Sequence, residues 1–138
     1  MKNIKQISIL AALLLTYSLP FSIQAFYYPE YLYNNDQIKL AYAHMGMGVY
    51  VDKTSVVTES YNPPYYKLAA NVIDYDWDKN REISIRTYYF TYDTDAGCIY
   101  IDGRGPYYNR PDSQAEANQR PVEIAKLVWE AAYHSEWN

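Results

Sequence analysis

The sequence predicts an α+β domain in which a four-stranded antiparallel meander is followed by a C-terminal helix packed on one face. Between residues 49 and 102, runs of β-branched and aromatic residues alternate with polar or proline-containing connections. These connections are about 3 to 6 residues long, a length that joins antiparallel neighbours rather than parallel strands. Near the C-terminus, one longer segment is apolar around most of a helical surface, which favours a helix that covers a sheet.

The first predicted strand begins at residues 49–51 and continues at 56–58, after a turn or bulge at 52–55. A turn is predicted at 62–64, because the two prolines there cannot donate ladder hydrogen bonds. Residues 93–97 (DTDAG) contain the residue types that form hairpin turns. The remaining predicted strands are 65–75, 82–92 and 98–102.

The C-terminal helix is predicted over residues 122–133, and Pro121 fits its first position because proline preorganises the backbone there. A capping-box pattern at 113–116 predicts that a helical turn starts at that point. The polar residues of 122–133 form one narrow stripe, so most of the helix surface is expected to be covered. That stripe consists of Glu123, Lys126 and Glu130.

Alternation along the predicted strands assigns one face of the sheet to the core beneath the helix. The opposite face is expected to be rich in tyrosine, since the chain has 18 tyrosines and only Tyr17 precedes residue 26. The residues predicted to face the helix are Val49, Val51, Leu68, Ala70, Val72, Ile83, Ile85, Ile99 and Ile101.

Residues 1–25 have the layout of a secretory signal peptide. Lys2 and Lys5 precede an apolar run at 7–19, and Ala25 ends a candidate cleavage site. The run is shorter than the roughly 20 apolar residues of a spanning helix, so no stable membrane span is expected after the signal is removed. The chain is therefore predicted to be exported to the periplasm, the cell surface or the medium. The predicted organisation is a signal peptide at 1–25, an extended or partly helical lead at 26–48 and a single α+β domain at 49–138.

Composition and cysteine content exclude several classes of protein. The chain carries 16 acidic and 12 basic residues, a formal net charge of −4, which disfavours the broad phosphate contacts of nucleic-acid binding. With 49% hydrophobic residues, it is too apolar to be disordered. Its one cysteine, Cys98, cannot form an internal disulfide and lies far from residue 25, so no lipid anchor is predicted. We expect Cys98 to be a small buried residue in a strand, with a reactive thiol or an intermolecular link as the alternatives.

No catalytic residue, cofactor or specific metal site is predicted. Asp74, Asp76 and Asp78 alternate and make a weak calcium candidate, but the helix-loop-helix calcium motif needs glycine at its sixth position and glutamate at its twelfth. Lys79 and Ile85 occupy those positions, so a solvated acidic turn is the preferred interpretation. The sequence contains neither a nucleophile-elbow nor a phosphate-loop pattern. We therefore expect a protein that is not an enzyme.

Six aromatic residues form the candidate binding surface, because an exposed tyrosine combines a flat apolar ring with one hydroxyl group. The alternative is that these rings are buried and serve packing. Separately, the glycines on either side of Arg104 could bring its charge close to an anionic partner, with a strand-ending turn as the alternative. The six aromatic candidates are Tyr88, Phe90, Tyr92, Tyr100, Tyr107 and Tyr108.

Two short motifs resemble small exported bacterial domains of the surface-adhesin protein E family. Tyr50, Asp52 and Ser55 follow a Tyr-x-Asp-x-x-Ser pattern, and residues 66–73 follow Tyr-x-x-Ala-x-Asn-Val-Ile. The aromatic third strand and the C-terminal helix extend the resemblance over residues 49–133. It implies an α+β sheet-and-helix domain at the cell surface, where some members of the family bind host or matrix proteins, and it brings no catalytic residue.

Together these observations predict an exported, non-enzymatic domain that binds a protein or a glycan through a tyrosine-rich sheet face. It would act at the cell envelope or outside the cell. One alternative is an assembly protein that buries the same face in an oligomer, and another is a hydrolase with no recognisable site. The identity of the partner and the oligomeric state are left open.

Overall fold

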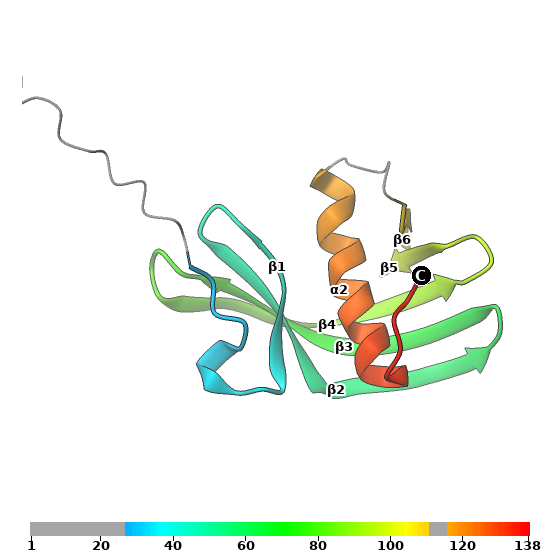
Figure 1. Ribbon diagram of the computed structural model, residues 1–138, viewed down its shortest axis with the longest axis horizontal. Helices are drawn as coiled ribbons and strands as arrows, with labels where there is room; N and C mark the ends of the chain where they lie inside the picture. The colour runs from blue at the N-terminus through cyan, green and yellow to red at the C-terminus, as the bar shows by residue number, and fades with distance from the viewer. Residues whose placement is uncertain (1–26, 111–115) are drawn as a thin grey trace, which may run out of the picture.

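Six antiparallel strands form one curled sheet, a half-barrel in which each strand lies beside its neighbours in sequence (Figure 1). This computed structural model describes residues 27–110 and 116–138. The predicted signal peptide and residues 113–115 of the capping-box pattern lie outside the described residues. One helix, α2 (Glu116–Tyr133), crosses the sheet on what we term the concave face, and the other side is the convex face. The other elements are η1 (Leu32–Asn34), β1 (Ile38–His44), β2 (Met47–Asn62), β3 (Tyr65–Asp76), β4 (Arg81–Asp93), β5 (Cys98–Ile101) and β6 (Arg104–Tyr108).

The predicted four-stranded meander is wrong, because the sheet contains two further strands at its edges. β1 arises within the predicted lead, where Ile38, Leu40 and Tyr42 recur at the spacing of a strand rather than of a helix. β6 arises after the predicted end of the sheet. It is short and contains Pro106, which an edge strand tolerates because its outer amides need no partner in the ladder. Both strands extend the curl and so enlarge the concave face.

The long strand β2 bends at the position of the predicted turn or bulge at 52–55. Its pairing with β3 shifts register between Asp52 and Val57, so the feature is a bulge within one continuous strand. The side chain of Ser55 stabilises it, since its hydroxyl donates to the Asp52 carbonyl (2.6 Å) and accepts from the Asn71 amide (2.7 Å). A bulge increases local twist, which contributes to the curling of the sheet around α2.

Helix α2 starts at Glu116, so Pro121 lies inside the helix rather than at its first position. Its apolar side packs on the concave face, and the Tyr92 hydroxyl donates to the backbone carbonyl of Ala125 at 2.7 Å. This hydrogen bond ties the centre of the helix to β4. The buried residues of this core are Val49, Val51, Leu68, Ala70, Val72, Phe90, Tyr92, Ile99, Val122, Ile124, Ala125, Leu127, Val128, Trp129 and Trp137.

The prediction that Ile83 and Ile85 belong to the core beneath α2 is wrong, since these side chains are 51% and 53% exposed. Ile83 lies at a register shift in the pairing of β4 with β3 and borders a hollow beside Pro121, whereas Ile85 follows the regular alternation. Phe90 and Tyr92 decide which side chains of β4 point toward α2, because these larger rings are buried beneath the helix. Successive side chains of a strand point to opposite faces, so Ile85 falls on the convex face, opposite Ile73. The other residues predicted to face the helix lie in the core or pack against it: Val49, Val51, Leu68, Ala70, Val72, Ile99 and Ile101.

A second, smaller core lies on the convex face, around Leu32 of η1. Tyr50, Ile73 and Tyr75 are buried there, and the Tyr50 hydroxyl donates to the Pro29 carbonyl at 3.0 Å while accepting from the Trp77 indole at 3.1 Å. The segment around η1 therefore covers one end of the convex face. Within the described ranges, no helix has the length and apolar character that crossing a membrane requires.

Candidate functional site

The structure separates the six predicted aromatic residues into a buried group and two groups near the surface. Phe90 and Tyr92 are 1% and 0% exposed beneath α2, so their rings mainly serve packing. Burial also raises the pKa of the Tyr92 hydroxyl well above its usual value, since the ionised form would lose its hydration. The expectation that these rings lie on the face away from the helix is therefore corrected.

Tyr100 and Tyr108 are half-buried on the opposite side of the sheet from the other four aromatic residues. Tyr100 follows Ile99, and Tyr108 follows Tyr107. Because Ile99 and Tyr107 pack in or against the main core, alternation directs the two tyrosines that follow them to the convex face. The guanidinium of Arg110 lies 4.7 Å from the ring centroid of Tyr108. The aromatic set predicted as one surface is thus divided between two faces.

Three of the predicted residues do meet around one hollow, which we term the basic pocket. Tyr88, Phe90 and Tyr107 line this pocket of about 350 Å³, between the start of α2 and strands β4 to β6. In Figure 1 the labels β5 and β6 lie on the opposite side of α2 from β1, and the basic pocket is on that β5–β6 side. Its remaining lining residues are Arg86, Ile101, Asp102, Arg104, Arg120, Pro121 and Ile124.

Three arginines reach the basic pocket from different elements. Arg86 precedes Tyr88 by two residues on β4, so the two share a face; its guanidinium donates to the Tyr88 hydroxyl and lies 5.0 Å from the ring centroid. Arg104 starts β6 directly after a tight turn in which Asp102 and Gly103 have φ values of 49° and 74°. Glycine adopts such a conformation without a steric penalty. Arg120 comes from the first turns of α2.

The basic pocket carries positive charge that the described protein does not fully neutralise. Arg120 pairs with Asp74 at 2.8 Å. Neither Arg86 nor Arg104 forms an ion pair with a carboxylate in the described part of the chain. Among the described lining residues, Asp102 is the sole carboxylate, and its Oδ1 already accepts from the Tyr89 amide at 3.0 Å. Because arginine presents planar donors suited to carboxylate, phosphate or sulfate, the arrangement can hold an anionic group.

The aspartates of the weak calcium candidate take part in three separate sets of contacts. Asp74 bonds Arg120 and also accepts from the Ser84 hydroxyl at 3.1 Å. Asp76 accepts from the Lys79 amide at 3.1 Å, as in a tight turn. The Asp78 carboxylate lies against the backbone of Gly46. Across the residues described, the His, Cys, Asp and Glu side chains form no group of three or more that could hold a metal ion.

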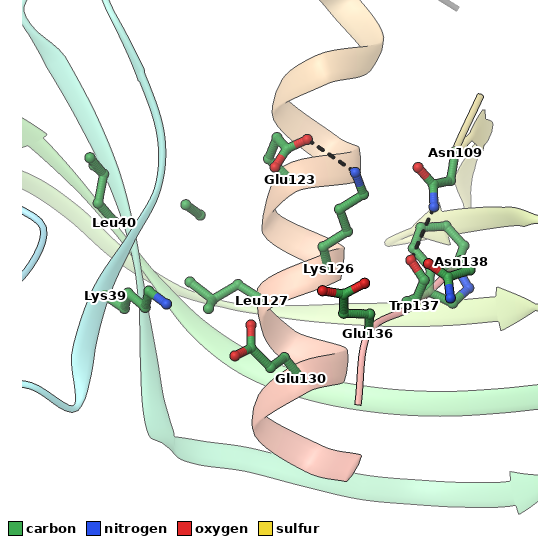
Figure 2. Close-up of a pocket in the computed structure, with 11 residues that line it drawn as sticks. Lys39, Leu40, Asn109, Glu123, Lys126, Leu127, Glu130, Glu136, Trp137 and Asn138 are labelled. Carbon is green, nitrogen blue, oxygen red and sulfur yellow. Dashed lines mark hydrogen bonds and ion pairs between the residues drawn. The ribbon is translucent and has the colours of Figure 1, made fainter. Parts of the chain in front are cut away.

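A larger hollow of about 480 Å³ lies between β1 and α2, and Figure 2 shows its mixed charge. Lys126 pairs with Glu123 at 3.4 Å, and carboxylates of Glu130 and Glu136 lie in the same region as Lys39. Its described lining includes no serine, threonine, cysteine or histidine. Two lysines and three glutamates of this hollow thus give it charges of both signs.

The two histidines and the cysteine of this chain are dispersed over the fold. His44 and His134 border different hollows, so they do not form a joint site. Cys98 is 2% exposed, and burial is the main reason that the pKa of its thiol is raised. A raised pKa reduces the thiolate fraction on which reactivity depends, which agrees with a packing role.

Arg86 and Arg120 are the site residues that sequence reasoning missed. The signal for Arg86 is its place in the same period-two pattern as Tyr88 and Phe90. Arg120 had no such signal, because its contact with β3 depends on where the helix lies.

Comparisons with protein-family models, with curated proteins and with solved structures each find no match to this chain. The resemblance to the surface-adhesin protein E family stays a prediction.

Proposed function

We propose that this chain is an exported, non-enzymatic binding domain whose basic pocket holds an anionic group carried on a flat or apolar body. The observation that carries this proposal is the meeting of Arg86, Arg104 and Arg120 around one hollow in a chain whose net charge is −4. Two of these guanidiniums have no carboxylate partner among the described residues. An anionic ligand would supply it.

The aromatic residues of the basic pocket support the second half of the proposal. Tyr88 and Tyr107 are half-buried, so each ring has an exposed part while the rest packs on the core. A flat or apolar group can pack on such rings at little cost in side-chain entropy. The partner classes predicted from the sequence, a protein or a glycan, can both present a carboxylate beside such a group.

The experiment is a titration of the purified protein with phenyl phosphate, followed by two-dimensional NMR. We expect shifts at the amides of Tyr88, Arg104 and Tyr107, and weaker binding at high salt because added ions screen the arginines. Benzyl alcohol, which has the same ring without the charge, should bind much more weakly.

Arg86→Gln is the informative variant, and Arg81→Gln is its matched control on the same strand but outside the basic pocket. A hydrogen bond to a charged group contributes about 1.5–3 kcal/mol, so Arg86→Gln should weaken binding at least about tenfold. Arg81→Gln should leave it unchanged. Equal affinities for phenyl phosphate in the two variants would contradict the proposed function.

A further inference from the structure

Another hollow, of about 610 Å³, adjoins the basic pocket, and we term it the apolar groove. It is lined by residues of the β1–β2 hairpin, which lies on the opposite side of α2 from β5 and β6 in Figure 1, and it shares Arg120 and Pro121 with the basic pocket. Most of the surface that lines it is apolar. The other residues that line it are Tyr42, His44, Met45, Met47, Val49, Asp74 and Ile83.

Two residues of the apolar groove have large apolar side chains that are exposed to solvent. Met45 is 79% exposed at the tip of the β1–β2 hairpin, where it has a φ of 46° followed by Gly46 at 81°. Such a turn favours asparagine, aspartate or glycine, because their side chains tolerate the left-handed conformation. Ile83 is 51% exposed on the strand that faces this hairpin across the hollow. An apolar ligand in the groove would cover both side chains.

The two hollows differ in what they can recognise. The apolar groove offers sulfur, methyl and ring groups, while the basic pocket offers two guanidiniums that have no carboxylate partner in the described ranges. A glycan would leave many of its hydroxyl groups without hydrogen-bond partners, because most of the groove surface is apolar, and this is unfavourable. A neutral apolar molecule would leave the arginines unused. Charge complementarity at one end and apolar contact at the other favour a ligand with both properties.

We propose that the two hollows together bind a free, single-chain carboxylate amphiphile of the fatty-acid class. Arg86 and Arg104 hold the carboxylate, and the acyl chain crosses Arg120 and Pro121, the residues that the two hollows share, to lie against Met45, Met47 and Ile83. This inference rests on the proposed function, because it takes the same basic pocket as the site of the anionic group. It adds the acyl chain and the groove that receives it.

The experiment measures the affinity of the full protein for butyrate, octanoate and decanoate by isothermal titration calorimetry, below the concentrations at which they form micelles. Burial of each methylene group strengthens binding roughly fourfold, so decanoate should bind far more tightly than butyrate. Decanol, which has the chain without the charge, should bind more weakly than decanoate. Affinity that does not rise with chain length would overturn the inference.

The variants separate the groove from the pocket. Ile83→Ser and Met45→Asn should weaken decanoate binding by about tenfold and leave phenyl phosphate binding unchanged. Ile85→Ser is the matched control, since Ile85 is equally exposed on the same strand but on the convex face. Met45→Asn also suits the turn, so it should fold at least as well as the original chain, which thermal unfolding will check.

Failure of this inference can be told apart from failure of the proposed function. If Ile83→Ser and Ile85→Ser bind decanoate equally well, the groove is not the site of the chain, while the arginine dependence of phenyl phosphate binding would still support an anion pocket. If phenyl phosphate binding does not depend on Arg86, both proposals are wrong. Binding to anionic phosphatidylglycerol vesicles in the absence of decanoate binding would also overturn the inference, because it would indicate a membrane surface rather than a free amphiphile.

Discussion

The guanidinium of Arg120 donates to Oδ1 of Asp74 at 2.8 Å, and this ion pair joins α2 to β3 where the basic pocket and the apolar groove meet. The Ser84 hydroxyl donates to the other oxygen of Asp74 at 3.1 Å, so the carboxylate is held from both sides. Of the three arginines around the basic pocket, Arg120 is thus the one held by a carboxylate of the described protein. Arg120 therefore holds α2 in position on the sheet more than it binds a ligand.

We expect the Arg120–Asp74 pair to contribute about 0.5–1 kcal/mol to the free energy of unfolding, because solvent screens a pair of this kind. The side chain of Arg120 is 43% exposed and that of Asp74 is 16% exposed. The measurement is a double-mutant cycle of Arg120→Gln and Asp74→Asn by urea unfolding. The coupling should shrink in high salt. Strictly additive effects of the two substitutions would show that the pair contributes nothing.

Tyr92 should make the protein less stable at alkaline pH. Burial raises the pKa of its hydroxyl above the ordinary value of 10.0, so the folded state favours the protonated form. The resulting contribution of Tyr92 to the free energy of unfolding is fully present below about pH 10. It is lost as the pH rises above the pKa of the unfolded state, and the free energy then falls by up to about 1.4 kcal/mol per pH unit. Unfolding free energies measured from pH 8 to 11 should fall less steeply in Tyr92→Phe.

The same variant tests the hydrogen bond to α2. Near pH 7, Tyr92→Phe should cost about 1 kcal/mol, since it removes the bond to the Ala125 carbonyl and keeps the ring. Tyr89→Phe is the control, because Tyr89 is 52% exposed. An alkaline slope as steep in Tyr92→Phe as in the original chain would mean that other groups carry the pH dependence.

Phe90→Ala and Tyr89→Ala should differ strongly although the residues are adjacent. Phe90 is 1% exposed beneath α2, so its truncation should cost about 3–5 kcal/mol through lost burial and a cavity. Tyr89 lies on the convex face, and its truncation should cost about 0.5 kcal/mol or less. Urea unfolding measures both values. A reversed order would indicate that the face of β4 toward the helix is misassigned.

Local sequence signals determined several parts of this protein. The residue types at 93–97 predicted the hairpin turn that joins β4 to β5, and the Asp93 carboxylate accepts from the Ala96 amide there at 3.0 Å. The β-branched and aromatic runs located β2 to β5 to within a few residues. Turn chemistry and propensity act over neighbouring residues, so one chain is enough to reveal them.

The tertiary structure alone decided which face of each strand is buried and which distant residues meet. Period-two alternation fits either face equally well, and burial of Phe90 and Tyr92 beneath α2 placed Ile85 outside. Likewise, Arg86, Arg104 and Arg120 come together because the curl of six strands brings β4, β6 and α2 around one hollow. Contacts between residues so far apart in the chain depend on register and on the position of the helix, which no local pattern encodes.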